Sequence, residues 1–322
     1  MQSYRLGLIG AQVDLSLSPF IHQAFFEASG LQGSYELLNV SSAELSGSKL
    51  RSLFAEGMDG LNITVPHKLS VTGYLDELSS VVQACGAVNT IVCDQQSRRL
   101  IGHNTDVLGL SACLRRSFPH FWQPEKKDLA VVIGLGGAAR AAVLALIELG
   151  YQHFVILGRR TQAGRKFITE LRESMAVAQL HRSSAEVGQG QEYLRDFSIS
   201  FGSVLNVDAN LLSLVGSGTA LLNASTIGHD EQDEAEYSWL AEVIAGMSPR
   251  YACDLVYAKD AEPTVFCRLS KEAGLPTCDG RIMLVEQARY AFELWTGVLP
   301  PFDPGWLALE TAQSARAMAS GN

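Results

Sequence analysis

The stretch Asp128–Arg140, DLAVVIGLGGAAR, decides the fold of the second half of the chain. Asp128–Ile133 is an apolar run of strand length, and the glycine-rich turn after it opens an alanine-rich segment that ends at Gly150. Strand, G-x-G-x-x-A turn and helix follow one another as in Rossmann domains, where the helix amino terminus binds a dinucleotide pyrophosphate. The expected cofactor contacts are Gly134, Gly136, Gly137, Ala138 and Ala139. Taken alone, the same motif also fits a structural turn or the S-adenosylmethionine site of a methyltransferase.

The next predicted strand, His153–Leu157, runs into Gly158 and then into Arg159, Arg160 and Thr161. At this place an acidic side chain binds the ribose hydroxyls of NAD, whereas an arginine accommodates the 2′-phosphate of NADP. Two arginines and no acid favour NADP, with NAD as the alternative cofactor.

The composition is that of a soluble globular protein whose 322 residues suit two domains. A net charge of −9 argues against nucleic acid or an anionic membrane as a partner. The six cysteines are scattered without a C-x-x-C pair, which predicts buried, reduced thiols and no metal site. With no signal peptide or membrane-spanning run in sight, we expect a cytoplasmic protein, a monomer or homodimer.

In the first half, Gly60–Lys68 has the sequence GLNITVPHK. A strand over Leu61–Val65 that stops at the following proline leaves Thr64 and Lys68 at its carboxyl end, where α/β proteins bind ligands. A single lysine at such a place is usually an ordinary surface charge. Because predicted strands alternate with helices here, including one over Ala43–Phe54, we expect a mainly parallel sheet.

Three further polar positions each allow two interpretations. Ser16 and Ser18 precede a predicted helix and can hold a carboxylate at its amino terminus, although Ser18 also suits a plain N-cap. Asp106 opens a helix predicted over Val107–Phe118, where an aspartate is commonly a dipole partner. Asn89 can bind a polyol or close a turn.

Five short motifs follow one another along the chain: SLSP at 16–19, NITVPHK at 62–68, GAVNT at 86–90, GHNTD at 102–106 and MLVEQA at 283–288. Together they resemble the shikimate/quinate dehydrogenase family over nearly the whole chain. The resemblance implies two α/β domains with the active site in the cleft between them. A discontinuous substrate-binding domain would comprise 1–106 plus 281–322, and a Rossmann NAD(P)-binding domain would comprise 107–280.

The resemblance also implies roles for individual residues. Lys68 and Asp106 would be the catalytic acid/base pair, and Ser16 and Ser18 would hold the carboxylate of shikimate. The other substrate contacts would be Thr64, Asn89, Tyr257 and Gln287, while Ser225 and Gly280 would lie along the dinucleotide. The implied reaction is NADP-dependent interconversion of shikimate and 3-dehydroshikimate, in the shikimate pathway of aromatic amino acid biosynthesis.

Departures from the family pattern keep two alternatives open. Arg159 replaces an asparagine, Ile282 replaces a second glycine, and Ala258-Lys259 replaces Asn-Pro, which suggests a divergent branch. One alternative is a catabolic quinate/shikimate dehydrogenase that uses NAD; Ser18 argues against it, because quinate-preferring members often carry threonine there. The other is a non-catalytic sensor of a shikimate-type metabolite, which would not need an acid/base pair. Residues 175–208 match nothing in the family.

Overall fold

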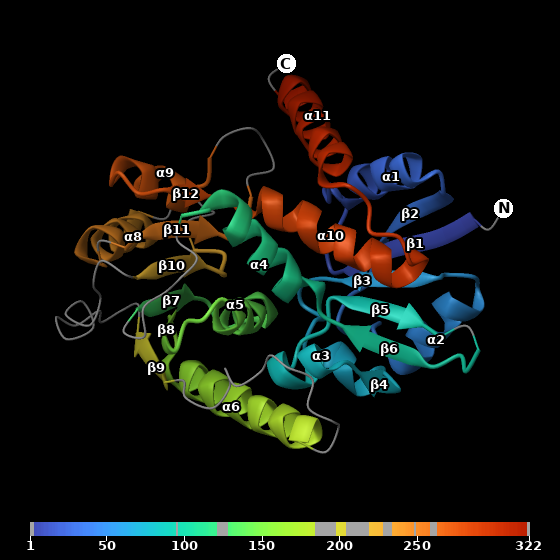
Figure 1. Ribbon diagram of the computed structural model, residues 1–322, viewed down its shortest axis with the longest axis horizontal. Helices are drawn as coiled ribbons and strands as arrows, with labels where there is room; N and C mark the ends of the chain where they lie inside the picture. Colours follow the sequence, from blue (N-terminus) through green and yellow to red (C-terminus); the bar gives the residue numbers. More distant parts are fainter. Residues whose placement is uncertain are drawn as a thin grey trace. The chain divides into compact units, whose positions relative to one another are not determined.

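The computed structural model describes residues 3–94, 96–120, 128–183, 198–203, 219–227, 234–247, 249–257 and 263–320. The described chain forms two compact units. The first unit contains the residues up to Gly109 and those from Leu284 onward, and the second contains the residues between Leu110 and Met283. Each unit is built on one six-stranded sheet with helices beside it, so the predicted α/β fold class is confirmed (Figure 1).

The sheet of the first unit has the strand order β2-β1-β3-β5-β6-β4. Its strands are β1 (Ser3–Gly10), β2 (Gln32–Asn39), β3 (Gly60–Ile63), β4 (Glu77–Leu78), β5 (Thr90–Cys93) and β6 (Leu100–His103). This sheet is mixed, because β5 runs antiparallel to both β3 and β6 while the other pairs are parallel. The short connection between β5 and β6 explains the difference from the expected mainly parallel sheet, since a parallel pair needs a crossover of a dozen or more residues.

The helices of the first unit come from both ends of the chain. They are α1 (Ser18–Ser29), α2 (Gly47–Ala55), the 3-10 helix η1 (Ser70–Tyr74), α3 (Ser80–Cys85), the larger part of α10 (Gly280–Thr296), and α11 (Phe302–Ser320). Helix α11 packs against α1 (Figure 1). In α10, the indole of Trp295 donates to the Ile91 carbonyl at 3.0 Å and lies so close to Gly60 that a Cβ there would be 2.2 Å from Nε1. The carboxyl-terminal helices therefore complete the core of the first unit.

Helix α2 begins later than the sequence predicted. The side chain of Ser46 caps it by accepting from the Lys49 amide at 3.2 Å. The preceding residues form a separate turn, in which Glu44 Oε2 accepts from both the amide and the hydroxyl of Ser41. A side chain that closes its own turn withholds those residues from the helix.

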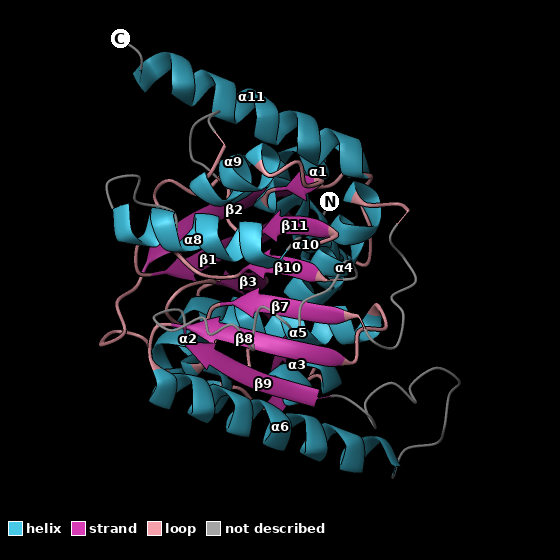
Figure 2. Ribbon diagram, turned by 90° about the vertical axis from the view of Figure 1, so that its left-hand side faces the viewer, coloured by secondary structure: helices cyan, strands magenta, loops and turns pink. Residues whose placement is uncertain are grey.

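The sheet of the second unit is entirely parallel, with the strand order β12-β11-β10-β7-β8-β9. Its strands are β7 (Leu129–Ile133), β8 (His153–Gly158), β9 (Ser198–Ser203), β10 (Ala220–Asn223), β11 (Tyr251–Asp254) and β12 (Thr277–Cys278). The earliest of these six strands in the sequence, β7, lies in the middle of the sheet, and the later strands extend from it in both directions (Figure 2). Such a reversal of strand order is where Rossmann sheets bind dinucleotides.

The helices of the second unit are α5 (Gly137–Glu148), α6 (Thr161–Ser183), α8 (Glu234–Met247), α9 (Val265–Glu272) and the later half of α4 (Thr105–Ser117). Strand β7 is fully buried, and α5 is buried along most of its length. That burial accounts for the continuous apolar and alanine-rich sequence around the glycine loop, because strands covered on both faces are apolar throughout.

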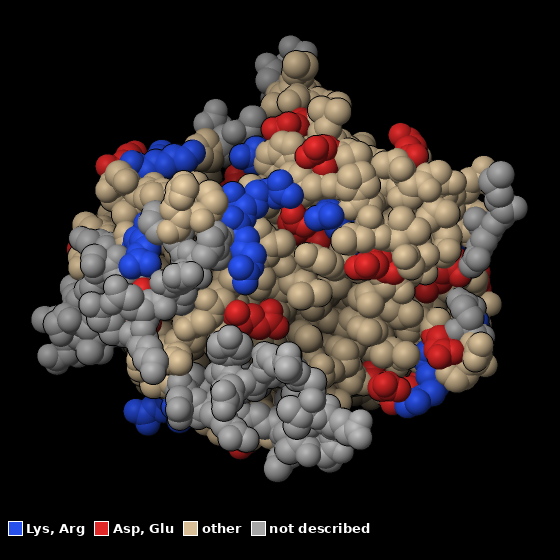
Figure 3. Space-filling model, in the orientation of Figure 1, with Lys and Arg blue, Asp and Glu red and all other residues tan. Residues whose placement is uncertain are grey.

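Charged side chains of both signs are interspersed on the face shown in Figure 3, with broad uncharged areas between them. No helix in the described part of the chain is long and apolar enough to cross a membrane.

Candidate functional site

Lys68 follows β3 on a turn that a buried histidine holds in place. Strand β3 ends at Ile63, earlier than the expected Val65, although the amide of Thr64 still donates to the Ile9 carbonyl at 2.9 Å. In the turn, His67 is fully buried and its Nε2 lies 2.6 Å from the Val40 carbonyl oxygen. The Lys68 carbonyl accepts from the Val88 amide at 2.8 Å, so the backbone is fixed on both sides of the lysine.

The Lys68 ammonium donates to Asp106 Oδ2 at 2.6 Å. The side chains are 16% and 6% exposed, so this ion pair is shielded from water but still reachable through the lysine. Asp106 Oδ1 accepts from Asn89 Nδ2 at 2.8 Å, and the Asp106 amide donates to Asn104 Oδ1 at 3.0 Å. Both carboxylate oxygens are thus occupied, which fixes the direction in which Lys68 is held. A largely buried charge needs such partners, since an unpaired one is strongly destabilising.

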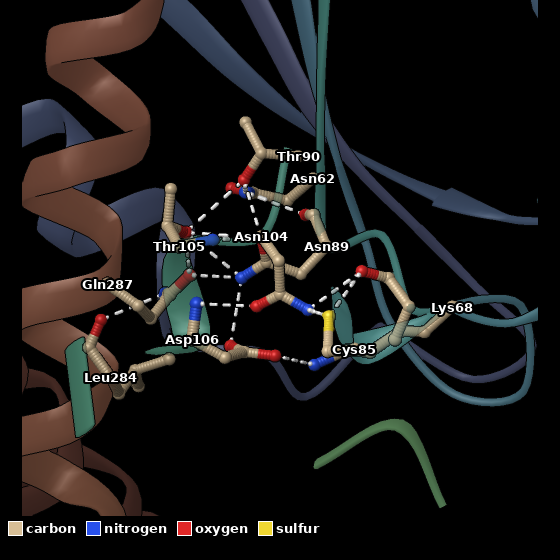
Figure 4. A network of polar contacts seen from close by, with 11 residues as sticks. Asn62, Lys68, Cys85, Asn89, Thr90, Asn104, Thr105, Asp106, Leu284 and Gln287 are labelled. Carbon is tan, nitrogen blue, oxygen red and sulfur yellow. Dashed lines mark hydrogen bonds and ion pairs between the residues drawn. The ribbon is translucent and has the colours of Figure 1, made fainter. Parts of the chain in front are cut away.

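Asn89 is the centre of a buried polar network in the first unit (Figure 4). Its Nδ2 also donates to Thr105 Oγ1 at 3.0 Å and more weakly to Gln287 Oε1 at 3.4 Å, and its Oδ1 accepts from the Thr105 amide at 2.7 Å. Gln287 Nε2 donates back to the Leu284 carbonyl of its own helix at 2.9 Å. The structure therefore brings Lys68, Asn89, Asp106 and Gln287 together, as their assignment to one site requires.

Several members of this network were not assigned from the sequence. Asn62 donates to the Asn89 carbonyl and to Thr90 Oγ1, both at 3.1 Å, and accepts from the Tyr35 hydroxyl at 2.7 Å. Asn62 is 5% exposed, inside a strand whose other residues are glycine or apolar. A buried amide needs partners, so an asparagine within this apolar strand was the signal that could have identified it.

Ser16, in the loop before α1, contacts Ser18, the first residue of that helix. The Ser16 hydroxyl donates to Ser18 Oγ at 3.1 Å and accepts from the Ser18 amide at 3.2 Å. The N-cap alternative for Ser18 is wrong, because Leu17 is the N-cap of α1 and no side chain caps it. From α11, Arg316 Nη1 donates to the Leu15 carbonyl at 2.7 Å and its Nη2 to the Ser16 carbonyl at 3.3 Å, which places a positive charge beside this loop.

Tyr35 connects the serine loop with the Asn89 network. Its hydroxyl donates to Asn62 Oδ1 at 2.7 Å and interacts with the side chain of Ser18. Burial raises the pKa of the Tyr35 hydroxyl well above its ordinary value, although the hydrogen bond with Ser18 opposes the shift, so the group stays protonated as a donor. Thr64 follows β3 and lies beside the end of β1, where a Cβ on Gly10 would be 2.5 Å from its Cγ2. Ser16, Thr64 and Lys68 thus all follow the carboxyl ends of the neighbouring parallel strands β1 and β3.

In the second unit, the glycine loop between β7 and α5 has a backbone that a ligand can approach closely. Gly134 has a φ of +130°, and a Cβ there would lie 2.6 Å from the Ala224 carbonyl oxygen. Gly136 is the N-cap of α5 without a side-chain cap, and a Cβ there would meet nothing within 4 Å. The first turn of α5 therefore has no capping side chain, and the space beside Gly136 is open. This fits the pyrophosphate of a dinucleotide, which binds where such amides and the helix dipole point.

The other expected cofactor residues of the second unit lie at three places. Arg159, Arg160 and Thr161 are exposed at the end of β8 and the start of α6. Ser225 belongs to a local turn, because its hydroxyl donates to Asn223 Oδ1 at 2.8 Å and accepts from the Ile227 amide at 3.1 Å. Packing is sufficient to require glycine at position 280, since a Cβ there would be 2.3 Å from the Leu255 carbonyl oxygen.

Tyr257 lies half-buried after β11, and its contact with substrate stays a prediction. The departure at Ala258-Lys259 falls outside the described residues, as does most of 175–208.

Comparison with known proteins identifies the family. The family described as shikimate dehydrogenase substrate binding domain matches residues 8–91, and the shikimate 5′-dehydrogenase C-terminal domain matches residues 283–309. The shikimate dehydrogenase (NADP(+)) of Citrifermentans bemidjiense is 31% identical over 98% of this chain and 96% of its own length. The chain belongs to the shikimate dehydrogenase family. The corresponding protein of Caldanaerobacter subterraneus is 33% identical over 90% of this chain and 91% of its own.

Solved structures extend the similarity to the fold of the family. A shikimate dehydrogenase in complex with NADP+ superposes with a TM-score of 0.76 at 28% identity, over 97% of this chain and 96% of the other. The Thermus thermophilus shikimate 5-dehydrogenase in complex with NADP(H) and shikimate gives 0.70 at 29% identity, covering 96% and 99%. The quinate dehydrogenase of Corynebacterium glutamicum in complex with NAD gives 0.74 at 26% identity, also covering 96% and 99%. Shikimate and quinate enzymes of the family therefore share this architecture.

Proposed function

We propose that this protein is an NADP-dependent oxidoreductase that interconverts shikimate and 3-dehydroshikimate, with Lys68 and Asp106 as its acid/base pair. The observation that carries the proposal is the shielded ion pair of Lys68 and Asp106, held in direction by Asn89. A metabolite sensor has no need of a proton donor, whereas reduction of a ketone needs one at the carbonyl oxygen.

Bound NADPH supplies the hydride for the ring carbonyl carbon of 3-dehydroshikimate. As negative charge develops on the carbonyl oxygen, the Lys68 ammonium donates a hydrogen bond to it, stabilises the charge and transfers a proton. Asp106 keeps the ammonium aimed at this oxygen throughout. In the reverse direction, neutral Lys68 takes the proton from the substrate hydroxyl. Because 16% of the lysine side chain is exposed, the proton can exchange with solvent between turnovers.

The remaining polar groups suit the parts of shikimate that do not react. Ser16 and Ser18, with the Tyr35 hydroxyl behind them, would bind the carboxylate, and Arg316 adds the positive charge that an anion needs in this acidic protein. Thr64, Asn89, Asp106 and Gln287 would bind the ring hydroxyls. Tyr257 is a further proposed substrate contact, and Arg159, Arg160 and Thr161 would bind the 2′-phosphate of NADP.

The decisive experiment measures initial rates for shikimate and for quinate, each with NADP and with NAD. We expect turnover of shikimate with NADP, and a loss of about 10²–10⁴-fold in kcat for Lys68→Met, the usual contribution of a positioned acid/base. Lys49→Met, which removes a lysine from α2 in the same unit, is the matched control and should keep full activity. Preference for quinate and NAD would move the enzyme to the catabolic alternative. Saturable shikimate binding without turnover of any pair would overturn catalysis in favour of sensing.

We expect the protein to work in the cytoplasm as a monomer or homodimer. Size-exclusion chromatography with light scattering distinguishes the two oligomeric states.

A further inference from the structure

Three of the six cysteines meet in the second unit, although their spacing in the sequence predicted no cluster. The Sγ atoms of Cys113, Cys253 and Cys278 all lie within 4.8 Å of one another. Cys253 and Cys278 are register partners on the parallel strands β11 and β12, so their side chains leave the sheet on the same face. Cys113 comes from the end of α4, which reaches these strands (Figure 1).

The spacing of the three sulfur atoms fits a single metal ion. Zinc–sulfur bonds of about 2.3 Å place the sulfur atoms of a tetrahedral site about 3.8 Å apart. The three sulfur atoms lie within 4.8 Å of one another, so reaching that separation needs a shift of at most about 1 Å. A disulfide between Cys253 and Cys278 would use two thiols and leave the third buried beside it. A metal ion would use all three, which is the simpler account of why a helix and two strands converge on this point.

We propose that Cys113, Cys253 and Cys278 form a mononuclear binding site for a thiophilic d¹⁰ cation, with Zn²⁺ as the preferred ion. Thiolate ligands select Zn²⁺ and Cu⁺ among common metals. With three thiolates Zn²⁺ leaves one net negative charge and Cu⁺ leaves two. A buried net charge is costly, so the ion that cancels more of the thiolate charge is favoured.

Binding displaces the thiol protons to solvent and forms three metal–sulfur bonds, with no change in oxidation state. Cys113 and Cys253 are buried, and Cys278 is partly exposed, so an ion enters past Cys278. Water completes the fourth position, where the Ser117 hydroxyl, 4.0 Å from Cys113 Sγ, can orient it. The bound ion would tie α4 to β11 and β12. Because it binds only the folded unit, it would raise the melting temperature.

The test uses the full-length protein, reduced with a phosphine and freed of metal by a chelator. Titration with Co²⁺ should saturate at one equivalent and give sulfur-to-cobalt charge-transfer absorption in the near ultraviolet, and Zn²⁺ should remove this band. Cys113→Ser and Cys278→Ser should each weaken Zn²⁺ binding at least about 100-fold, since even the outer partners of metal ligands contribute about 10–100-fold. Cys93→Ser, at a buried cysteine on β5 of the first unit, is the matched control and should bind as the wild type does.

The wild-type titration decides the proposal even if a variant fails to fold. Absence of a saturable one-equivalent Co²⁺ or Zn²⁺ complex would overturn it, as would binding that survives Cys113→Ser. Tight binding of Cu⁺ without binding of Zn²⁺ would overturn the assignment to Zn²⁺. If the purified protein, unfolded without reductant, shows two thiols fewer than six and binds no Zn²⁺ after reduction, the cluster is a disulfide pair instead.

Discussion

The two units prepare their candidate sites by opposite means. In the first unit, the site is made of side chains that bond to one another out of water, with Lys68, Asp106 and Asn89 at the centre. In the second unit, it is made of backbone shape at Gly134 and Gly136, with exposed arginines beyond it. In a buried network, removing one side chain leaves its partners without hydrogen bonds, so the loss is shared by the whole network. In a glycine loop with exposed arginines, each residue contributes to ligand binding separately. We therefore expect substitutions in the first unit to be coupled and large, and those in the second to be graded.

The largest effect should come from breaking the ion pair. Asp106→Asn keeps the shape of the side chain but removes the charge that holds Lys68, and we expect a loss in kcat of about 10²–10⁴-fold. The double variant Lys68→Met/Asp106→Asn should lose little more than either single variant, since residues that act as one unit are strongly non-additive. Steady-state kinetics of the three variants measures this coupling. Fully additive losses in the double variant would contradict the coupled description of the first unit.

The two loop glycines provide a matched pair in the second unit. Gly134→Ala forces a side chain into a φ of +130° and against the Ala224 carbonyl, so we expect lower stability by about 1–3 kcal/mol and loss of NADP binding. Gly136→Ala meets open space, so its stability should stay within about 0.5 kcal/mol of the wild type. Its NADP binding should still weaken, because the added methyl group stands in the path of the pyrophosphate. Denaturant unfolding and NADP titration separate the two effects; equal stability losses would refute the distinction.

A smaller and more selective effect is expected at the arginines. Arg159→Ala and Arg160→Ala should each raise the KM for NADP about tenfold, the equivalent of one hydrogen bond to a charged group of about 1.5 kcal/mol. The KM for NAD should remain unchanged, because NAD lacks the 2′-phosphate. Lys166→Ala, an exposed lysine on α6, is the control for a general loss of positive charge. Equal increases in KM for NADP and NAD would show that these arginines do not bind the 2′-phosphate.

The smallest effect at neutral pH should come from His22, a buried ring of the first unit that stacks on Tyr35 with 4.2 Å between ring centroids. Neither ring nitrogen has a hydrogen-bond partner among the described residues, and burial lowers the pKa of His22 from 6.5 to about 3. Below pH 6.5 this histidine is protonated in the unfolded chain, whereas in the folded chain it stays neutral until about pH 3. His22 therefore lowers the free energy of unfolding as the pH falls from 6.5 towards 3, by at most about 1.4 kcal/mol per pH unit.

His22→Phe keeps an aromatic ring without the titrating group, so it should flatten the fall in stability at acid pH and cost little at pH 7. Urea unfolding of both proteins between pH 4 and pH 8 on a common scale measures the difference, with the upper end as the internal control. An unchanged acid slope in the variant would assign the slope to other groups.

Sequence reasoning located the features that depend on local pattern. The glycine loop and its strand were predictable because burial and backbone shape restrict the residue types allowed there. The polar network was predictable only in part, since Asn89 and Gln287 are 198 positions apart and hydropathy does not report which distant polar groups meet. Asn62 was missed for the same reason. The cysteine cluster was missed because its members come from one helix and two strands whose order in space the sequence does not state.

The indole of Trp295 links the last part of the chain to strands formed by the first hundred residues, across 204 positions. During synthesis, β3 and β5 leave the ribosome long before the tryptophan that covers Gly60. At about 5–20 residues per second, that interval lasts on the order of ten seconds or more. The second unit, whose sequence is continuous, can complete its sheet within this interval. The scaffold that holds the acid/base pair of the first unit is thus completed only after the strands of the second unit have been made.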